Sequence, residues 1–319
     1  MESNKNKTMK WKQVALVGGL ALVAITILVI RFETKNTASA QGTQMTFQSS
    51  AEAGAELAKV AKSGDEAALA SILGVDAKAR LINGDPEADK TAMAAFAAKY
   101  EKMNRWVEMN DGSRVLYVGV DNFAFPVPLA KNSSGQWYFD EVAGAQEISA
   151  RDIGRNELLA IDACSAIANA QELYFFRGGL SPEYAQRIIS TSGKQDGLYW
   201  PVSQTQSSSP LGDFSQFPKS SLGSNPPQEP FVIDGYTLRI LNAQGDAAPG
   251  GAEGYIVNGK MTRGFAILAT PVEYGETGIM TFVTGRDGVV YERDLGPDTV
   301  KIAASIQEFN PTEDWSPVE

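Results

Sequence analysis

The chain has 319 residues, which is enough for two ordinary domains, and its formal net charge is −10. Residues 1–13 carry +3, so the remaining residues carry −13. A body this acidic is repelled by phosphate backbones, which excludes nucleic-acid binding. The sequence contains no histidine and a single cysteine, Cys164. These counts exclude histidine-based catalysis, histidine-ligated metal sites and an internal disulfide.

Residues 14–30 (VALVGGLALVAITILVI) form an uncharged segment in which eleven residues are Leu, Ile or Val. As a helix, such a segment spans about 26 Å, near the lower limit for crossing a membrane. Four lysines precede it, so the positive-inside rule places the N-terminus in the cytoplasm and the body outside. We expect residues 1–40 to anchor the protein in a bacterial inner membrane through a single transmembrane helix.

A cleaved signal peptide is the alternative interpretation of the same segment. The pattern Ala38-Ser39-Ala40 has the small residues that signal peptidase prefers. Cleavage after Ala40 would release the protein into the periplasm. Both interpretations place the rest of the chain outside the cytoplasm.

The first part of the body, residues 41–150, is predicted to be an α+β domain. A capping box at residues 49–52 starts one helix. Asp65 is a candidate cap for a second helix that ends at Gly74, and apolar residues at helical spacing predict a third over residues 93–103.

Three runs rich in β-branched and aromatic residues follow these helices. They are residues 114–120, 123–130 and 136–142. Residues 132–135 (NSSG) predict a turn, and Pro126 and Pro128 place the middle run at a sheet edge or bend, because proline donates no main-chain hydrogen bond. The order predicts a helix-backed, curved antiparallel sheet, for which the nuclear-transport-factor-two type is one candidate.

The second part of the body, residues 151–319, is also predicted to be α+β. A long helix is expected from about Arg155 to Phe175, with Cys164 as a buried small side chain on its inner face. Ser181-Pro182-Glu183 is typical of the start of another short helix. A Ser- and Pro-rich surface loop covers residues 203–230.

Antiparallel strands are predicted to complete this second domain. The runs are residues 235–242, 264–272, 278–284 and 289–293. Asp287-Gly288, between the last two runs, is a strong hairpin signal. The order predicts a long helix packed on an antiparallel sheet.

Long strings of unusual sequence resemble a bacterial family known only as a domain of unknown function (DUF twenty-nine-fifty). They are FPVPLAK (125–131), GQWYFDEVAGAQEI (135–148), RDIGRNELLAI (151–161), GKQDGLYWP (193–201) and the stretch 243–297. Together they span nearly the whole of the body. The resemblance implies no activity, cofactor or catalytic residue.

Residues 155–293 also resemble, more weakly, the globular part of a pseudopilin. The resemblance rests on Ala170-Gln171-x-x-Tyr174, Tyr184-Ala185, residues 196–199, Gly254-Tyr255, Ala269-Thr270-Pro271 and residues 287–289. It implies a helix laid across a small antiparallel sheet. Pilins carry a Glu early in their apolar helix, whereas residues 14–30 contain no acid and a whole domain intervenes.

Carboxylates are the remaining candidates for catalysis, and four of them lie in or beside predicted strand-end loops: Asp196, Glu273, Asp287 and Asp294. A facing pair could hydrolyse a glycosidic bond, but an Asp before Gly is fully explained as a turn residue. The glycine-rich run 245–254 lacks the spacing of a phosphate-binding loop. We therefore assign no catalytic, cofactor-binding or metal-binding residue.

A set of aromatic side chains is the candidate ligand surface, together with Asp196. The aromatic residues are Trp137, Tyr199, Trp200, Tyr255 and Tyr274. They would line an apolar or sugar-binding groove, although aromatic residues in strands are more often core residues.

These features predict a non-enzymatic binding or scaffolding module of the cell envelope, with an envelope protein or polysaccharide as its partner. Two alternatives stay open: a carboxylate-based hydrolase of envelope polymer, and a pseudopilin-like component of a secretion or surface-fibre system.

Overall fold

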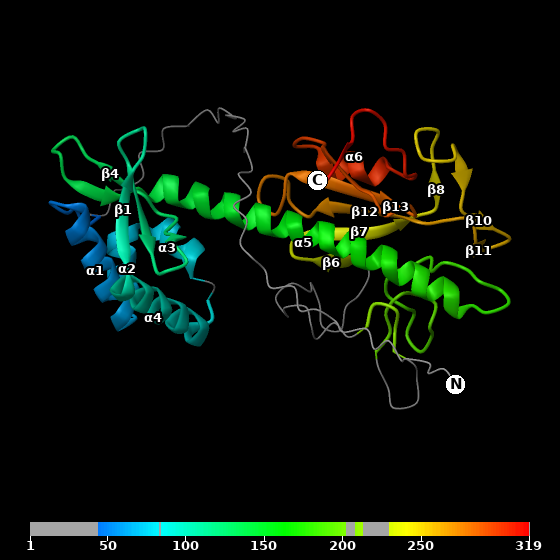
Figure 1. Ribbon diagram of the computed structural model, residues 1–319, viewed down its shortest axis with the longest axis horizontal. Helices are drawn as coiled ribbons and strands as arrows, with labels where there is room; N and C mark the ends of the chain where they lie inside the picture. Colours follow the sequence, from blue (N-terminus) through cyan, green and yellow to red (C-terminus); the bar gives the residue numbers. More distant parts are fainter. Residues whose placement is uncertain (1–43, 83, 202–207, 213–229, 319) are drawn as a thin grey trace, which may run out of the picture. The chain divides into compact units, whose positions relative to one another are not determined.

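The computed structural model describes residues 44–82, 84–201, 208–212 and 230–318. These residues form six helices and several antiparallel sheets (Figure 1), which confirms the predicted α+β class. The predicted membrane or signal helix, residues 14–30, lies outside the described residues, as does most of the predicted loop 203–230. Within the described part of the chain, no helix combines the length and the apolar character that a membrane crossing requires.

Four helices open the described chain. They are α1 (Ser50–Ser63), α2 (Glu66–Leu73), α3 (Val75–Leu81) and α4 (Pro86–Lys102). The predicted cap at Ser49 is confirmed, because Ser49 Oγ accepts from the Glu52 amide at 3.2 Å. The Glu52 carboxylate reaches back to the Gln48 amide at 2.8 Å, one residue before the amide that a capping box uses. Asp65 caps α2 as predicted. Helix α3 was not predicted, because Ala77 is its single buried residue and it therefore shows no apolar periodicity.

An antiparallel sheet follows these helices. Its strands are β1 (Asn104–Glu108), β2 (Arg114–Val118), β3 (Phe123–Ala124), β4 (Leu129–Lys131) and β5 (Trp137–Phe139), in the order β1-β2-β4-β5 with β3 beside β2. The predicted run 123–130 is two short strands separated by Pro126 and Pro128, as their missing donors require. The predicted turn at 132–135 is confirmed by hydrogen bonds from the Ser134 and Gln136 amides to Asn132 Oδ1.

Helix α5 (Glu141–Arg177) is far longer than predicted, so the expected start near Arg155 was wrong. Asp140 caps the helix by accepting from the Ala143 amide at 3.0 Å. The first turns of the helix, which were not predicted, include Gly144. A Cβ atom at this position would clash with Val127, because it would lie 2.7 Å from Val127 Cγ1. The predicted domain boundary at residue 150 falls within this helix.

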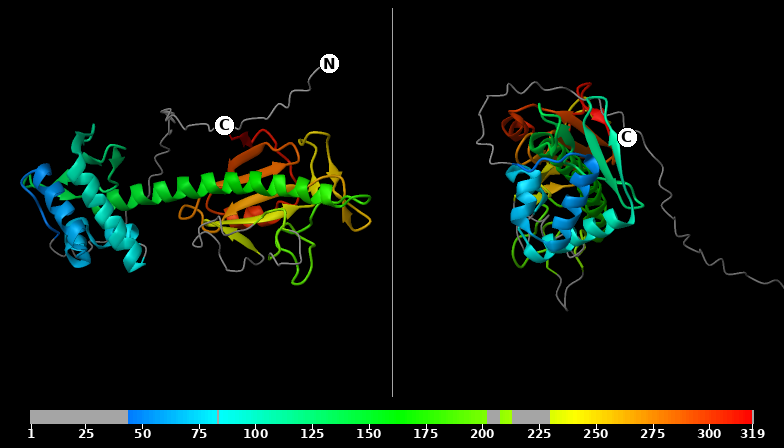
Figure 2. Two further views of the ribbon diagram at one scale, coloured as in Figure 1. Left: turned by 60° about the horizontal axis from the view of Figure 1, so that its bottom comes forward. Right: turned by 90° about the vertical axis from the view of Figure 1, so that its left-hand side faces the viewer.

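The second large sheet has the strand order β15-β14-β13-β12-β7-β6 and is antiparallel throughout. Its strands are β6 (Phe231–Ile233), β7 (Tyr236–Leu241), β12 (Ala266–Pro271), β13 (Met280–Gly285), β14 (Val290–Asp294) and β15 (Ser316–Pro317). Helix α5 lies against β7, β12, β13 and β14 (Figures 1 and 2). The Asp287-Gly288 hairpin is confirmed, with Thr284 opposite Val290 and Gly288 at φ +74°.

Smaller elements complete the second part of the chain. They are β8 (Ala243–Gln244), β9 (Glu253–Gly254), β10 (Ile256–Val257), β11 (Lys260–Met261) and α6 (Thr299–Ser305). The helix predicted from Ser181 is absent, so that prediction was wrong. The Tyr184 amide instead donates to Met261 O at 2.7 Å, and the buried Gln171 side chain bonds both the amide and the carbonyl of Ala185 at 2.8 Å. These tertiary bonds use the backbone groups that a helix would need.

The buried apolar side chains form two separate clusters. The first joins α1, α2 and the first sheet and receives Ile148 from α5. The second joins the later turns of α5 to the second sheet and includes Cys164, which is fully buried. Burial raises the pKa of the Cys164 thiol to about 12, so Cys164 is the small apolar core residue that the sequence predicts.

Candidate functional site: an apolar pocket among the N-terminal helices

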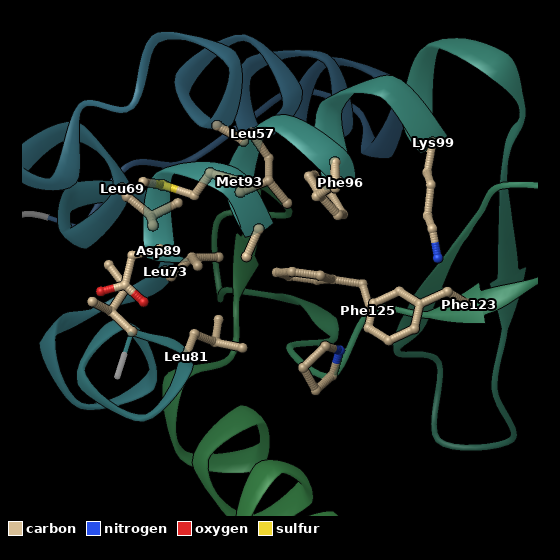
Figure 3. Close-up of a pocket in the computed structure, with 15 residues that line it drawn as sticks. Leu57, Leu69, Leu73, Leu81, Asp89, Met93, Phe96, Lys99, Phe123 and Phe125 are labelled. Atoms are coloured by element: carbon tan, nitrogen blue, oxygen red, sulfur yellow. The ribbon is translucent and has the colours of Figure 1, made fainter. Parts of the chain in front are cut away.

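A cavity of about 350 Å³ lies among the N-terminal helices and the segment that leaves β3 (Figure 3). Its lining is Leu57, Ala61, Leu69, Leu73, Leu81, Ile82, Asp89, Ala92, Met93, Ala95, Phe96, Lys99, Phe123, Phe125 and Pro126. All but two of these residues are apolar. The volume falls within the range of about 300–1,000 Å³ that is usual for small-molecule sites.

Helix periodicity places the walls of the pocket. Leu69 and Leu73 are four residues apart on α2, and Met93 and Phe96 are three apart on α4, so each pair projects from one side of its helix. The Phe96 ring meets the Phe125 ring at a centroid distance of 5.2 Å. Figure 3 shows Phe125 facing the helical wall across the cavity.

The space exists because α4 presents small side chains beside large ones. Ala92 and Ala95 line the pocket but are themselves exposed, so the cavity reaches solvent along α4. On the other side of the pocket, Pro126 and Pro128 lie between β3 and β4 and keep these two short strands from forming one continuous strand. The pocket is thus bordered by a loosely filled helix face and a break in the sheet.

Two charged side chains belong to the lining, and they differ in exposure. Asp89 is 5% exposed and accepts a hydrogen bond from the Gly84 amide at 3.2 Å. The Lys99 side chain is 43% exposed, and its Nζ atom lies 2.6 Å from Asp121 Oδ2 and 5.5 Å from the centroid of the Phe123 ring. The hydrogen bond from Lys99 holds the pKa of the Asp121 carboxyl below its usual range.

This arrangement suits retention of an apolar molecule. Its lining offers apolar area and one partly exposed cation, and it contains no hydroxyl, thiol or amide side chain. Among the described residues, no three acidic or cysteine side chains gather closely enough to hold a metal ion. The pocket therefore offers a ligand mainly apolar contacts.

The structure does not gather the predicted aromatic candidates into one groove. Trp137 is 6% exposed in the first cluster, where Arg114 and Lys131 lie 4.6 and 4.7 Å from its ring centroid. Tyr255 is 1% exposed in the second cluster and donates to Gln244 Oε1 at 3.0 Å. Both side chains are core residues.

The other aromatic candidates lie in the second part of the chain. Trp200 is 4% exposed, and its neighbour Tyr199 is half-buried against the second cluster and forms a bridge with Ile189. Tyr274 donates from its hydroxyl to Asp294 Oδ2 at 3.3 Å. Burial, followed by the charge of Asp294, raises the pKa of Tyr274.

Three of the four candidate acids hold turns. Asp196 accepts from the Thr191 amide at 2.7 Å and from the Thr191 hydroxyl at 2.8 Å. Asp287 accepts from the Val289 amide, and Asp294 accepts from the Gly296 amide. The turn interpretation of these residues is therefore supported. Glu273 acts through its backbone, whose carbonyl accepts from the Thr277 amide at 2.9 Å.

Glu157 and Glu292 are neighbouring acids that the sequence did not suggest. Glu157 Oε1 accepts from the amides of Ile279 and Met280 at 2.9 and 3.0 Å, which uses this carboxylate to hold the start of β13. Burial and then the charge of Glu157 raise the pKa of Glu292.

The fold and the pocket define an α+β protein with a candidate small-molecule site in its N-terminal part. A family model described as "Protein of unknown function (DUF2950)" matches residues 44–318, so the chain belongs to that family. This confirms the resemblance noted in the sequence. No curated protein and no solved structure matches the chain.

Sequence reasoning missed the pocket, although part of a signal was present. Residues 93–103 were predicted as a helix with an apolar face, and Lys99 is the cation that borders the same face. The sequence did not show which residues face this helix across the pocket. Those residues, Phe123, Phe125 and Pro126, come from a segment outside the helix.

Proposed function

We propose that this protein is a non-enzymatic binding module of the bacterial cell envelope that holds an apolar small molecule in its N-terminal pocket. The observation that carries the proposal is the apolar cavity of about 350 Å³. Small-molecule sites are typically concave and lined mainly by apolar side chains, as this pocket is. The turn roles of Asp196, Asp287 and Asp294 support a binding role over hydrolysis by these three acids.

The volume sets the size of the ligand. At the roughly 30 Å³ that a water molecule occupies in the liquid, the cavity holds about a dozen non-hydrogen atoms. Burying ten methylene groups at about 0.8 kcal/mol each contributes about 8 kcal/mol, and association costs at least about 4 kcal/mol. The remaining ~4 kcal/mol corresponds to a Kd of about 1 mM for a neutral chain.

A matched pair of variants on α4 tests the proposal. Ala95 lines the pocket, whereas Ala94 is also exposed but lies outside the lining. The probe is 1-decanol, with ligand-observed NMR as the readout. We expect Ala95→Phe to fill the cavity and weaken decanol binding at least tenfold, and Ala94→Phe to bind decanol as the parent protein does. Equal binding by both variants, or no binding by the parent, would refute the proposal.

The pseudopilin-like alternative is favoured by one specific observation, the packing of a long helix across an antiparallel sheet. Co-purification of the full-length protein with filament components would support this function. A monodisperse monomer without partners in envelope extracts would count against it.

A further inference from the structure

Of the two charged side chains that line the pocket, Lys99 is the one that is exposed enough to contact a polar head group of a ligand. Asp89 is almost fully buried and its carboxylate is hydrogen-bonded inside the protein, whereas the Lys99 side chain is 43% exposed. The exposed edge also contains Phe123, which is 41% exposed. A ligand that combines a chain with a polar group therefore places that group beside Lys99.

The ammonium group of Lys99 can donate more hydrogen bonds than it makes to Asp121. It can donate three hydrogen bonds, and one of them goes to Asp121 Oδ2 at 2.6 Å. Asp121 is 53% exposed, and an ion pair this exposed contributes at most about 1 kcal/mol. A ligand anion can therefore bind the same ammonium or replace Asp121 at little cost.

The loop after β2 fixes the position of Lys99. Gly119 has φ +72°, and a Cβ atom there would lie 2.5 Å from Asp121 Oδ1 and 3.2 Å from Lys99 Cγ. Asn122 also has positive φ, at +53°. The loop thus wraps the Lys99 stem, with Asp121 at its tip, and keeps the ammonium beside the Phe123 ring.

We propose, resting on the function above, that the ligand is a single alkyl chain of about ten carbons ending in a carboxylate that pairs with Lys99. The chain fills the space among Leu57, Met93 and Phe125, and the carboxylate stays at the exposed edge. A phosphate monoester carries nearly two charges at pH 7. Lys99 with Asp121 beside it matches one negative charge better than two.

Four ligands with the same chain test the head group: decanoate, 1-decanol, decylamine and decyl phosphate, each below its aggregation concentration. We expect decanoate to bind about fivefold more tightly than decanol, and decylamine to bind most weakly. The preference for decanoate over decanol is expected to fall with added salt, because the pair is partly exposed. Tighter binding of decyl phosphate than of decanoate would overturn the carboxylate assignment.

Three variants test the role of Lys99. Lys99→Met is expected to lose the preference for decanoate over decanol, and the ratio of the two affinities is the readout because the substitution also changes the pocket lining. Asp121→Asn is expected to strengthen decanoate binding about twofold to fivefold, because it removes the competing anion. Lys102→Gln is the control, since Lys102 is an exposed lysine of the same helix outside the pocket.

The outcomes separate this inference from the function on which it rests. Equal affinity for decanoate and decanol in the parent protein, with both blocked by Ala95→Phe, would overturn the carboxylate inference and keep the pocket. Failure of all four ligands to bind would overturn both. Thermal melts of each variant identify any that fails to fold, and Lys99→Gln then replaces Lys99→Met.

Discussion

The carboxyl group of Glu292 is a charged group placed where the fold disfavours its charge. It lies on β14 opposite Phe282, and cross-strand partners share one face of a sheet. That face meets α5, which contributes Glu157. Partial burial, and then repulsion from Glu157, raise the pKa of Glu292 above its ordinary value.

A raised pKa of a carboxyl group in the folded state means that the folded protein binds protons more tightly than the unfolded chain. The protonated carboxyl group therefore contributes to stability fully at pH values below its pKa in the unfolded chain. This contribution is lost as the pH rises through its pKa in the folded protein. We therefore expect Glu292→Gln to raise the free energy of unfolding at pH 7. We also expect this variant to show a smaller fall in the free energy of unfolding between about pH 4.3 and neutrality. Urea denaturation at several pH values measures this. Glu313→Gln, at an exposed position, is the control, and an unchanged or lower free energy of unfolding for Glu292→Gln would contradict the argument.

At the scale of elements, α5 contains two glycines with opposite surroundings. A Cβ atom at Gly144 would lie 2.7 Å from Val127 Cγ1, and Val127 is fully buried. At Gly154 a Cβ atom would meet nothing within 4 Å. The first glycine is needed for packing, whereas the second only weakens the helix.

Alanine substitutions at these two positions are expected to change stability in opposite directions. Gly144→Ala should lower the free energy of unfolding by about 1–3 kcal/mol through overpacking. Gly154→Ala should raise it by about 0.5–1 kcal/mol through helix propensity. Chemical denaturation of both variants measures this difference, and a shared sign would show that the packing of α5 against Val127 is not as described.

Local signals in the sequence predicted those elements whose stabilising contacts are local. The cap at Ser49, the turn at 132–135 and the Asp287-Gly288 hairpin all involve neighbouring residues. The failures involve distant partners: the first turns of α5 pack on Val127, and Tyr184 bonds Met261 instead of starting a helix. The pocket belongs to this second group, because its walls come from segments that meet only after folding.

At the scale of the whole molecule, the proposed location depends on residues 14–30, which lie outside the described residues. Their apolar composition and the preceding lysines favour insertion in the inner membrane. The acidic body would then lie outside the cytoplasm, and the proposed ligands would come from the envelope.

Cell fractionation tests this location. We expect the full-length protein to stay with the membrane fraction after a carbonate wash, because a transmembrane helix is not released by high pH. A soluble periplasmic form beginning at Gln41 would instead indicate cleavage after Ala40. An untrimmed protein dissolved in the cytoplasm would contradict the envelope assignment.

The pocket itself is tested most directly by NMR of the protein with labelled methionine methyl groups during titration with 1-decanol. Met93 lines the pocket, whereas Met261 is fully buried in the second cluster and serves as an internal reference. We predict that the Met93 methyl resonance shifts progressively as decanol is added, while that of Met261 stays in place. A Met93 resonance that does not move, or moves only together with Met261, would contradict a ligand site in the N-terminal pocket.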